Sequence, residues 1–289
     1  MHAKRTIKEV CAIHEMEPTL KDLFVEGSTD ESFIKWYIGN SGAGSVSVYP
    51  IDLIDVPDEI VLKHGLTAGS NRSRVLAVAC ELAEQRPQGL SVLCLADRDF
   101  EDYCPSVRDN AYILFTDCNS LDLYAFTLHT MRKFAAVALG GLPMPAETLM
   151  DMLIATLRQI YTLRLANELL GWGMRWISFT RYISFQQGAL TFRKEELIRT
   201  YLQNNTRWAD RGIFENKVQE AERLLDQDPR RTIRGHDFGD LFLWLIRKLR
   251  SDRKYGNRET LEGSLMASVE RCDLENAPFF RRLQTLATA

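Results

Sequence analysis

Short apolar runs alternate with helical patterns over the first half of the chain. Each run has the length and the β-branched content of a buried strand, and apolar residues between the runs recur at helical spacing. Strands alternating with helices predict a three-layer α/β domain with a largely parallel, Rossmann-like sheet. The predicted strands are 23–25, 46–51, 90–96 and 111–115, and the predicted helices are 29–38 and 75–82. The other segments are predicted to be a polar lead-in over 1–20 and a loop or an excursion at the sheet edge over 52–69.

The second half of the chain has a different pattern. Its apolar positions follow the helical period, and an aromatic-rich stretch over 172–192 could include one or two short strands. Glycine and proline break the composition at 140–145. Two domains are therefore predicted, an α/β domain over 1–142 and a mainly α-helical domain over 143–289. The predicted helices of this half are 146–170, 194–203, 214–225, 238–250 and 261–269.

Composition is that of a globular protein, with 45% hydrophobic and 26% charged residues in 289. No apolar run is long enough to span a bilayer, and the N-terminus lacks the apolar core of a signal peptide, so a cytoplasmic location is expected. The six cysteines show no C-x-x-C spacing, which favours free thiols over a zinc site or a set of disulfides.

The net charge of −3 conceals an asymmetry along the chain. Residues 1–126 hold 11 Lys and Arg against 20 Asp and Glu, whereas the remainder holds 25 against 19. An acidic half could concentrate metal ions and a basic half could bind a phosphate backbone. An uneven scatter of charge without function would give the same totals.

Carboxylates follow two of the predicted strands at the point where each strand ends. Glu26 comes directly after the first strand, and Asp97 and Asp99 come after the third. Ligands of open α/β sheets bind at the carboxyl ends of the strands. If the backbone stays extended, Asp97 and Asp99 point to the same side, with Arg98 opposite. Crowded carboxylates repel each other unless a cation, a shared proton or a basic partner intervenes.

Glu26, Asp97 and Asp99 are therefore predicted to be catalytic residues and ligands of Mg²⁺ or Mn²⁺, hard ions that suit carboxylate oxygens. Such an ion would orient a phosphodiester, stabilise developing charge and help to activate water. The alternative is a glutamate at the start of a helix and two aspartates in surface turns. Asp30 is a further catalytic candidate, although the macrodipole also favours an acidic residue in the first turn of a helix.

Four motifs resemble those of a known family. The sequence V-E-G-S-T-D over 25–30 and L-A-D-R-D over 95–99 resemble the toprim domain of the overcoming-lysogenisation-defect nucleases and of a related family of standalone toprim proteins. The segment F-T-D-C-N-S-L-D over 115–122 resembles that second family's segment after the next strand. G-H-D-F over 235–238 resembles its C-terminal Gly-His-Asp element.

The resemblance implies further site residues. Asp122 stands where the family is expected to favour Glu, so either Asp117 or Asp122 could supply a further metal ligand. His236 and the adjacent carboxylate could position the substrate, act as an acid or base, or pack against the toprim site. The alternative for the Gly-His-Asp element is that Asp237 simply caps the helix 238–250.

Length, motif order and composition are most similar to the toprim effector subunit of the PARIS anti-phage system. The resemblance implies a toxic, metal-dependent endonuclease that cleaves cellular RNA such as transfer RNA. It also implies an ABC-type ATPase partner that holds the protein inactive, and a homodimer after release. Three alternatives stay open: a DNA nuclease of the same fold, a non-catalytic partner module whose acidic residues dock onto the ATPase, and a small-molecule α/β enzyme, against which the lack of a nucleotide-binding glycine fingerprint weighs.

Eight basic residues are predicted to contact nucleic-acid phosphates. The first two follow a Gly-Ser-Asn sequence at a helix N-terminus, which is a common phosphate site and also an ordinary cap. The others precede the predicted helix 238–250 or end it, and cations are frequent at any helix C-terminus. The set is Arg72, Arg74, Arg230, Arg231, Arg234, Arg247, Lys248 and Arg250.

Overall fold

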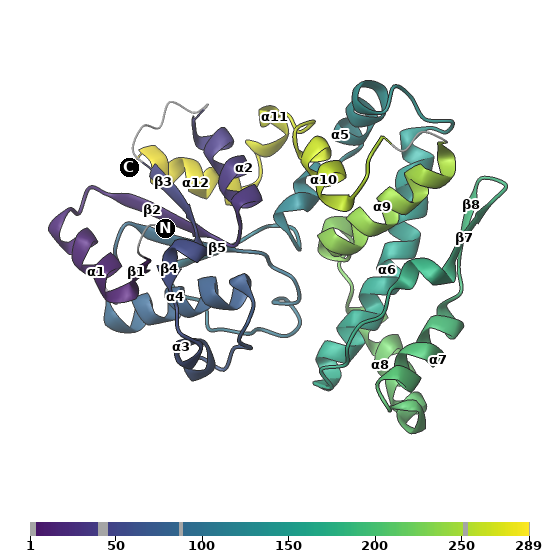
Figure 1. Cartoon of the computed structure of the whole chain (residues 1–289), viewed down its shortest axis with the longest axis horizontal. Helices are drawn as coiled ribbons and strands as arrows, with labels where there is room; N and C mark the ends of the chain where they lie inside the picture. The colour runs from purple at the N-terminus through teal and green to yellow at the C-terminus, as the bar shows by residue number, and fades with distance from the viewer. Residues whose placement is uncertain (1–3, 40–45, 87–88, 251–253, 289) are drawn as a thin grey trace. The chain divides into compact units, whose positions relative to one another are not determined.

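The computed structural model describes residues 4–39, 46–86, 89–250 and 254–288 (Figure 1). The chain forms two compact units. The first unit comprises Met1–Glu101, Pro105–Asp117 and Glu270–Ala289, and the second comprises Asp102–Cys104 and Cys118–Val269.

A four-stranded parallel sheet with the strand order β3-β2-β5-β6 forms the centre of the first unit. Leu23 pairs with Val48 on one side and with Leu93 on the other. All five residues of β5 are buried, because helices cover both faces, which explains why its sequence is a continuous apolar run. The strands are β2 (Lys21–Val25), β3 (Val46–Pro50), β5 (Val92–Ala96) and β6 (Ile113–Phe115).

Helices lie on both faces of this sheet (Figure 1). On one face α4 packs on β5, and α1 and α3 pack on α4; on the other face α2 packs on β2 and β3, and α12 packs on α2. The predicted α/β layering with a largely parallel sheet is confirmed. The helices are α1 (Ile7–Met16), α2 (Ser28–Gly39), α3 (Asp58–Lys63), α4 (Asn71–Gln85), α11 (Arg271–Leu274) and α12 (Pro278–Thr288).

Two predictions for irregular structure in this unit are wrong. The segment 1–20 contains α1, whose start is fixed by a capping box in which Thr6 and Glu9 exchange hydrogen bonds. The segment 52–69 contains α3 and the strand β4 (Ile54–Asp55), which pairs with β1 (Arg5–Thr6). The proline and acidic residues that suggested irregular structure instead mark the ends of short elements.

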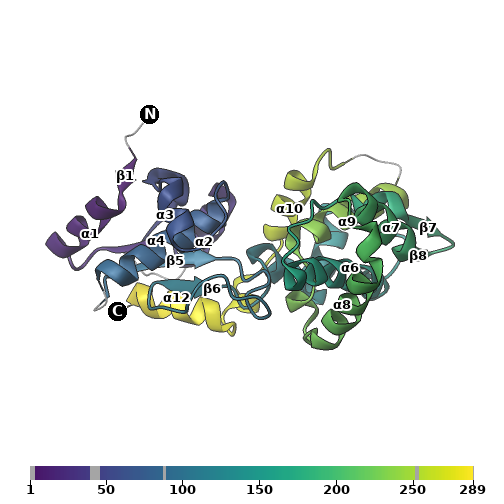
Figure 2. The same ribbon diagram turned by 90° about the horizontal axis from the view of Figure 1, so that it is seen from below.

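The last helix, α12, belongs to the first unit although it follows the helical part of the chain (Figure 2). Phe280 is fully buried, with its ring centroid 4.5 Å from that of Tyr37 in α2. Gln284 Nε2 donates a hydrogen bond of 2.7 Å to the Tyr37 hydroxyl. The two units therefore differ from the predicted domains 1–142 and 143–289: the second unit already begins at Cys118, and the chain after Val269 returns to the first unit, where α12 packs on α2.

The second unit is mainly helical, with α6 running over the predicted residues and packing on α8 and α9. The aromatic-rich stretch forms a hairpin of β7 (Ile183–Gln186) and β8 (Ala189–Phe192), whose two turn residues both have positive φ. The helices are α5 (Leu128–Lys133), α6 (Ala146–Leu170), α7 (Lys194–Asn204), α8 (Arg211–Leu224), α9 (Gly235–Leu249) and α10 (Arg258–Met266), and a 3-10 helix η2 (Leu121–Ala125) precedes them.

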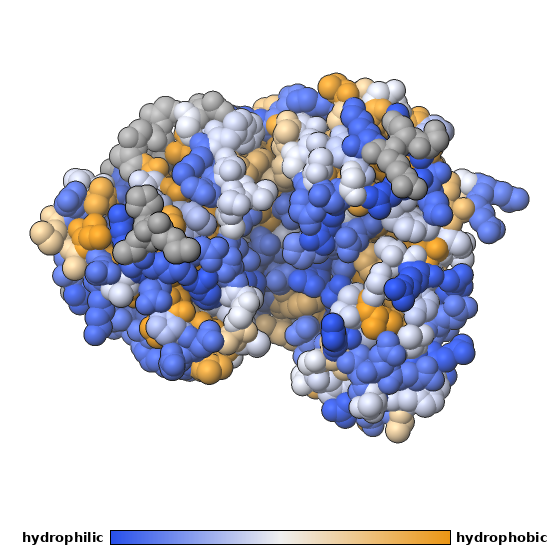
Figure 3. Space-filling model, in the orientation of Figure 1, coloured by the Kyte–Doolittle hydropathy of each residue, from blue (hydrophilic) through white to orange (hydrophobic). Residues whose placement is uncertain are grey.

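Hydrophilic residues predominate on the face drawn in Figure 3, and apolar residues form small patches among them. Exposed large apolar side chains are scattered along the sequence, as is normal for a protein surface. They include Met16, Trp36, Leu53, Leu62, Val137, Trp208, Ile213 and Leu224. Within the described part of the chain, no helix is both long enough and apolar enough to span a bilayer.

Replacing Phe280 with Ala should destabilise the first unit by about 3–5 kcal/mol, because the change removes a fully buried ring and leaves a cavity beside Tyr37. Urea unfolding measures the change in the free energy of unfolding. Arg282→Ala, at an exposed position of the same helix, is the matched control and should change stability by less than about 0.5 kcal/mol. Equal stability of the two variants would contradict a structural role for α12.

Candidate metal centre

The chain reverses its direction across the sheet between β2 and β5. From β2 it continues to β3 on one side, and it then returns to β5 on the other side of β2. Loops diverge at such a switch point and leave a crevice at the carboxyl ends of the two strands, where open α/β sheets bind ligands. Glu26 follows β2 and Asp97 follows β5, so both residues lie at this position.

The Glu26 side chain forms a hydrogen bond with the backbone at the end of the neighbouring strand, β5. Its Oε1 accepts a hydrogen bond of 3.0 Å from the backbone N–H of Asp97. Burial raises the pKa of Glu26 to about 7; the hydrogen bond from Asp97 opposes this rise, and the carboxylates of Asp30 and Asp99 add to it. Four of the predicted acidic residues therefore gather at one place.

The aspartate pair does not continue the strand as the sequence suggested. β5 ends at Ala96, and Asp99 has a φ of 46°, in the left-handed region. Thr116 explains the turn, because its Oγ1 accepts the backbone N–H of Arg98 at 3.1 Å and its carbonyl accepts Arg98 Nε at 2.7 Å. Aspartate is one of the few residues that tolerates this conformation.

The predicted ligands are grouped loosely. Glu26, Asp97 and Asp99 are not among the sets of three whose ligand atoms all lie within 4.8 Å of one another in the described residues. Mg²⁺ usually keeps several water ligands and takes only one or two carboxylates directly. A compact, fully protein-coordinated site is therefore not formed by these three residues in the described part of the chain.

Arg72, at the N-terminal turn of α4, supplies positive charge to this group. Its Nε donates to the carbonyl of Asp97 at 3.1 Å and lies 3.4 Å from Asp99 Oδ2, and its Nη2 bonds Glu101 at 2.6 Å. The neighbouring Asn71 donates to the carbonyl of Glu26 at 2.8 Å. The N-terminus of α4 therefore connects the ends of β2 and β5, and the role of Arg72 in binding phosphate stays a prediction.

Asp30 also has a local structural role. Its Oδ2 accepts the backbone N–H of Gly27 at 3.0 Å, which holds the turn between β2 and α2. Asp117 likewise accepts the backbone N–H of Phe279 at 3.1 Å and so fixes the start of α12. Asp122 lies in η2, in the second unit.

The Gly-His-Asp element opens α9, and its three residues have different environments. The helix begins at Gly235 with Arg234 as its N-cap, so the alternative prediction that Asp237 caps the helix is wrong. Asp237 instead forms a buried two-point ion pair with Arg164 of α6, with both N–O distances 2.7 Å. His236 is exposed and lies close to Asp122.

Most of the other predicted phosphate-binding residues contact the protein itself. Arg74 bonds Asp52 and the carbonyl of Ile54, Arg230 pairs with Asp228, and Arg231 pairs with Asp102 and Asp226. Arg247 bonds the carbonyl of Gly256, Arg250 bonds that of Gly141, and Lys248 lies over the Trp244 ring. Arg234 N-caps α9 through its backbone. These contacts give the residues structural roles.

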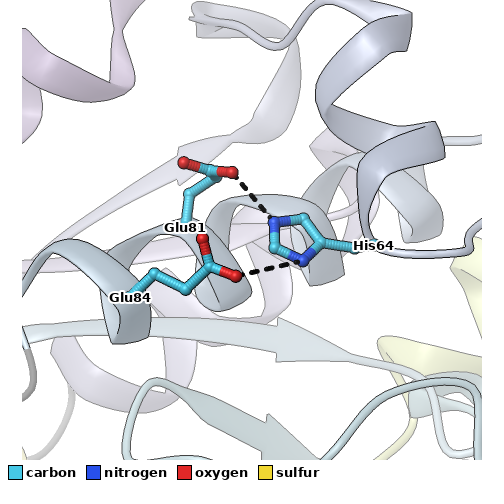
Figure 4. A group of neighbouring side chains, drawn as sticks. All are labelled: His64, Glu81 and Glu84. Atoms are coloured by element: carbon cyan, nitrogen blue, oxygen red, sulfur yellow. Dashed lines mark hydrogen bonds and ion pairs between the residues drawn. The ribbon is translucent and has the colours of Figure 1, made fainter.

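A second group of possible ligands in the first unit is already neutralised. His64 lies between Glu81 and Glu84, with one ring nitrogen 3.0 Å from Glu81 Oε1 and the other 4.0 Å from Glu84 Oε1 (Figure 4). Lys63 also contacts both carboxylates, at 2.6 Å from Glu84. The Lys63 ammonium supplies the positive charge that a metal ion would otherwise supply to these carboxylates. The group is therefore an ion-pair network that holds α3 on α4.

Sequence reasoning missed two acidic residues that take part in these clusters. Glu101 is the third acidic residue after this strand, following Asp97 and Asp99, and this spacing in the sequence could have indicated it. Glu262 lies in a helix without any motif, and only the structure brings it to Asp122 and His236.

No protein-family model matches the chain, and a search of curated proteins finds no relative.

Replacing Glu26 with Gln should stabilise the metal-free protein in a pH-dependent way. The pKa of about 7 in the folded state lies above the ordinary value of 4.5, so wild-type stability falls as pH rises from 4.5 through 7. The variant lacks this loss and should be more stable by about 3 kcal/mol above pH 8. Urea unfolding from pH 4 to 9 in a chelator measures the difference, and a difference that does not change with pH would contradict the burial of an ionisable Glu26.

Asp237→Ala should destabilise the second unit by about 3–5 kcal/mol, because it leaves the buried Arg164 guanidinium without its partner. The control is Asp240→Ala on the exposed side of the same helix, where the loss should stay below about 1 kcal/mol. Thermal and urea unfolding compare the two variants. A small effect of Asp237→Ala would contradict this structural role and favour a direct chemical role for the carboxylate.

Proposed function

We propose that this chain is a metal-dependent toprim nuclease that acts as the toxic effector of an anti-phage defence complex. One observation carries the proposal: the Glu26 carboxylate bonds the Asp97 backbone at the switch point of a parallel sheet, with Asp30 and Asp99 close enough to shift its pKa. The motifs at 25–30 and 95–99 resemble the toprim family at these same positions.

The residues at the switch point suit hydrolysis of a phosphodiester. Glu26 lies beside Asp97, where its carboxylate would take the proton of the attacking water. Asp97 and Asp99 would hold Mg²⁺ or Mn²⁺, which when bound stabilises charge on the phosphate oxygens. Arg72 balances the charge of Asp99 and Glu101 and keeps the α4 end in place.

The substrate and the partner follow from the resemblance alone. Cellular RNA such as transfer RNA is the proposed target, and an ABC-type ATPase is the proposed partner that holds the protein inactive until release as a homodimer. A DNA target and a non-catalytic docking module are the competing outcomes of the experiment below.

Glu26→Gln should reduce nucleic-acid cleavage by at least about 100-fold, because proton transfer by a positioned group contributes a factor of this order. Purified protein is incubated with total cellular RNA and with plasmid DNA, with Mg²⁺, with Mn²⁺ and with a chelator. Glu31→Gln, in the first turn of α2, removes the same charge from an ion pair with Lys35 and should cleave like the wild type.

The two substrates and the chelator separate the alternatives. Cleavage of RNA alone supports the proposed target, and cleavage of DNA alone identifies a DNA nuclease of the same fold. If Glu26→Gln cleaves as fast as the wild type, Glu26 is not catalytic. Expression in cells gives an independent reading, because growth arrest by the free protein should disappear with Glu26→Gln and persist with Glu31→Gln.

A further inference from the structure

Three possible metal ligands from separate elements meet within the second unit. Asp122 lies in η2, His236 in the first turn of α9 and Glu262 in α10, and one ligand atom of each lies within 4.8 Å of the other two. One imidazole and two carboxylates form a donor set that suits divalent transition ions such as Zn²⁺ and Mn²⁺. Arg258 is the basic neighbour of this cluster, with its Nε 3.3 Å from Glu262 Oε1.

Two glycines of α9 make room for the carboxylates. Gly235 and Gly239 are four residues apart and therefore lie on the same side of the helix. A Cβ atom on Gly235 would lie 3.0 Å from Asp122 Oδ2 and closer still to Ser120 Oγ. A Cβ atom on Gly239 would lie less than 3.0 Å from Glu262 Oε1. A larger residue at Gly239 would displace the Glu262 oxygen, and one at Gly235 would displace the Ser120 hydroxyl beside Asp122.

Buried oxygens at this place lack hydrogen-bond partners among the described residues. Ser120 is 6% exposed, and its Oγ makes no hydrogen bond, nor does Glu262 Oε1. Arg258 Nε lies 3.3 Å from Glu262 Oε1, which is an ion-pair distance without hydrogen-bond geometry. Leaving a buried polar group unsatisfied costs about 1–3 kcal/mol, so oxygens gathered in this way indicate a ligand that the chain itself does not supply.

Burial raises the pKa of Asp122, against the charges of His236 and Arg258. Burial also raises the pKa of Glu262 to about 8; the Asp122 carboxylate raises it further, and Arg258 lowers it. Both carboxyl groups are thus harder to ionise than in water.

We propose that Asp122, His236 and Glu262 form a binding site for a divalent transition ion, with Zn²⁺ or Mn²⁺ as the ion that fits. The ion would join η2, α9 and α10. Sequence reasoning assigned Asp122 and His236 to nuclease chemistry and did not include Glu262. The site is defined by residues of the second unit alone, so it does not depend on the proposed nuclease function.

The test is direct measurement of metal binding to the full chain after treatment with a chelator. Equilibrium dialysis against Zn²⁺, and separately against Mn²⁺, followed by elemental analysis gives the number of ions bound and their Kd. Glu262→Gln and His236→Gln should each weaken one site by at least about 100-fold, since even residues that only support a metal ligand contribute about 10- to 100-fold. His236 is exposed, so its variant tests the site even if the change at Glu262 disturbs folding.

The matched control is Glu259→Gln, which removes the same charge from an exposed position of α10 and should leave binding unchanged. Glu26→Gln should also retain this ion. If Glu26→Gln removes the ion while Glu262→Gln and His236→Gln retain it, the ion belongs to the switch-point residues; this overturns the inference and leaves the nuclease proposal intact. Absence of any bound ion in the wild type overturns the inference as well.

Discussion

Parallel pairing of β2 with β5 is the constraint on which the arrangement of acidic residues depends. The register Leu23 with Leu93 brings the ends of the two strands level, so the residue after β2 meets the first backbone N–H after β5. Residues of both strands are buried on both faces, so a shift of register would lose apolar packing on two sides at once. Core packing therefore fixes the position of Glu26 before any ligand binds.

That position has an electrostatic cost. Glu26 is largely buried, and Asp30 and Asp99 make its ionisation more difficult. Arg72 offsets part of this charge through Asp99, and Asn71 holds the turn through a carbonyl. A carboxyl group whose pKa is raised to about 7 and that has other carboxylates beside it is stabilised by binding either a proton or a cation. Perturbed carboxyl groups of this kind occur at functional sites and in structural ion-pair networks alike.

The sequence predicted the elements in which apolar residues recur regularly. It did not predict contacts between elements that are far apart in the chain. The strands of the four-stranded sheet, α6 and the acidic residues at the ends of β2 and β5 follow from apolar runs and their ends. The short elements α1 and α3 were missed because their capping residues resemble loop residues. The return of α12 to the sheet depends on packing over more than 200 residues, which no local pattern carries. Glu262 was missed for the same reason.

The total charge did not predict the contacts that individual Lys and Arg residues make in the second unit. Its excess of Lys and Arg suggested a phosphate-binding surface, yet several of these residues bond carboxylates or carbonyls in their own unit, and the buried ion pair of Arg164 with Asp237 is the strongest case. The Gly-His-Asp element shows the same division of roles: Asp237 stabilises the packing of α9 on α6, Gly235 makes space, and only His236 remains exposed to ligands. The three adjacent residues of the motif thus have different surroundings, because successive residues of a helix point in different directions.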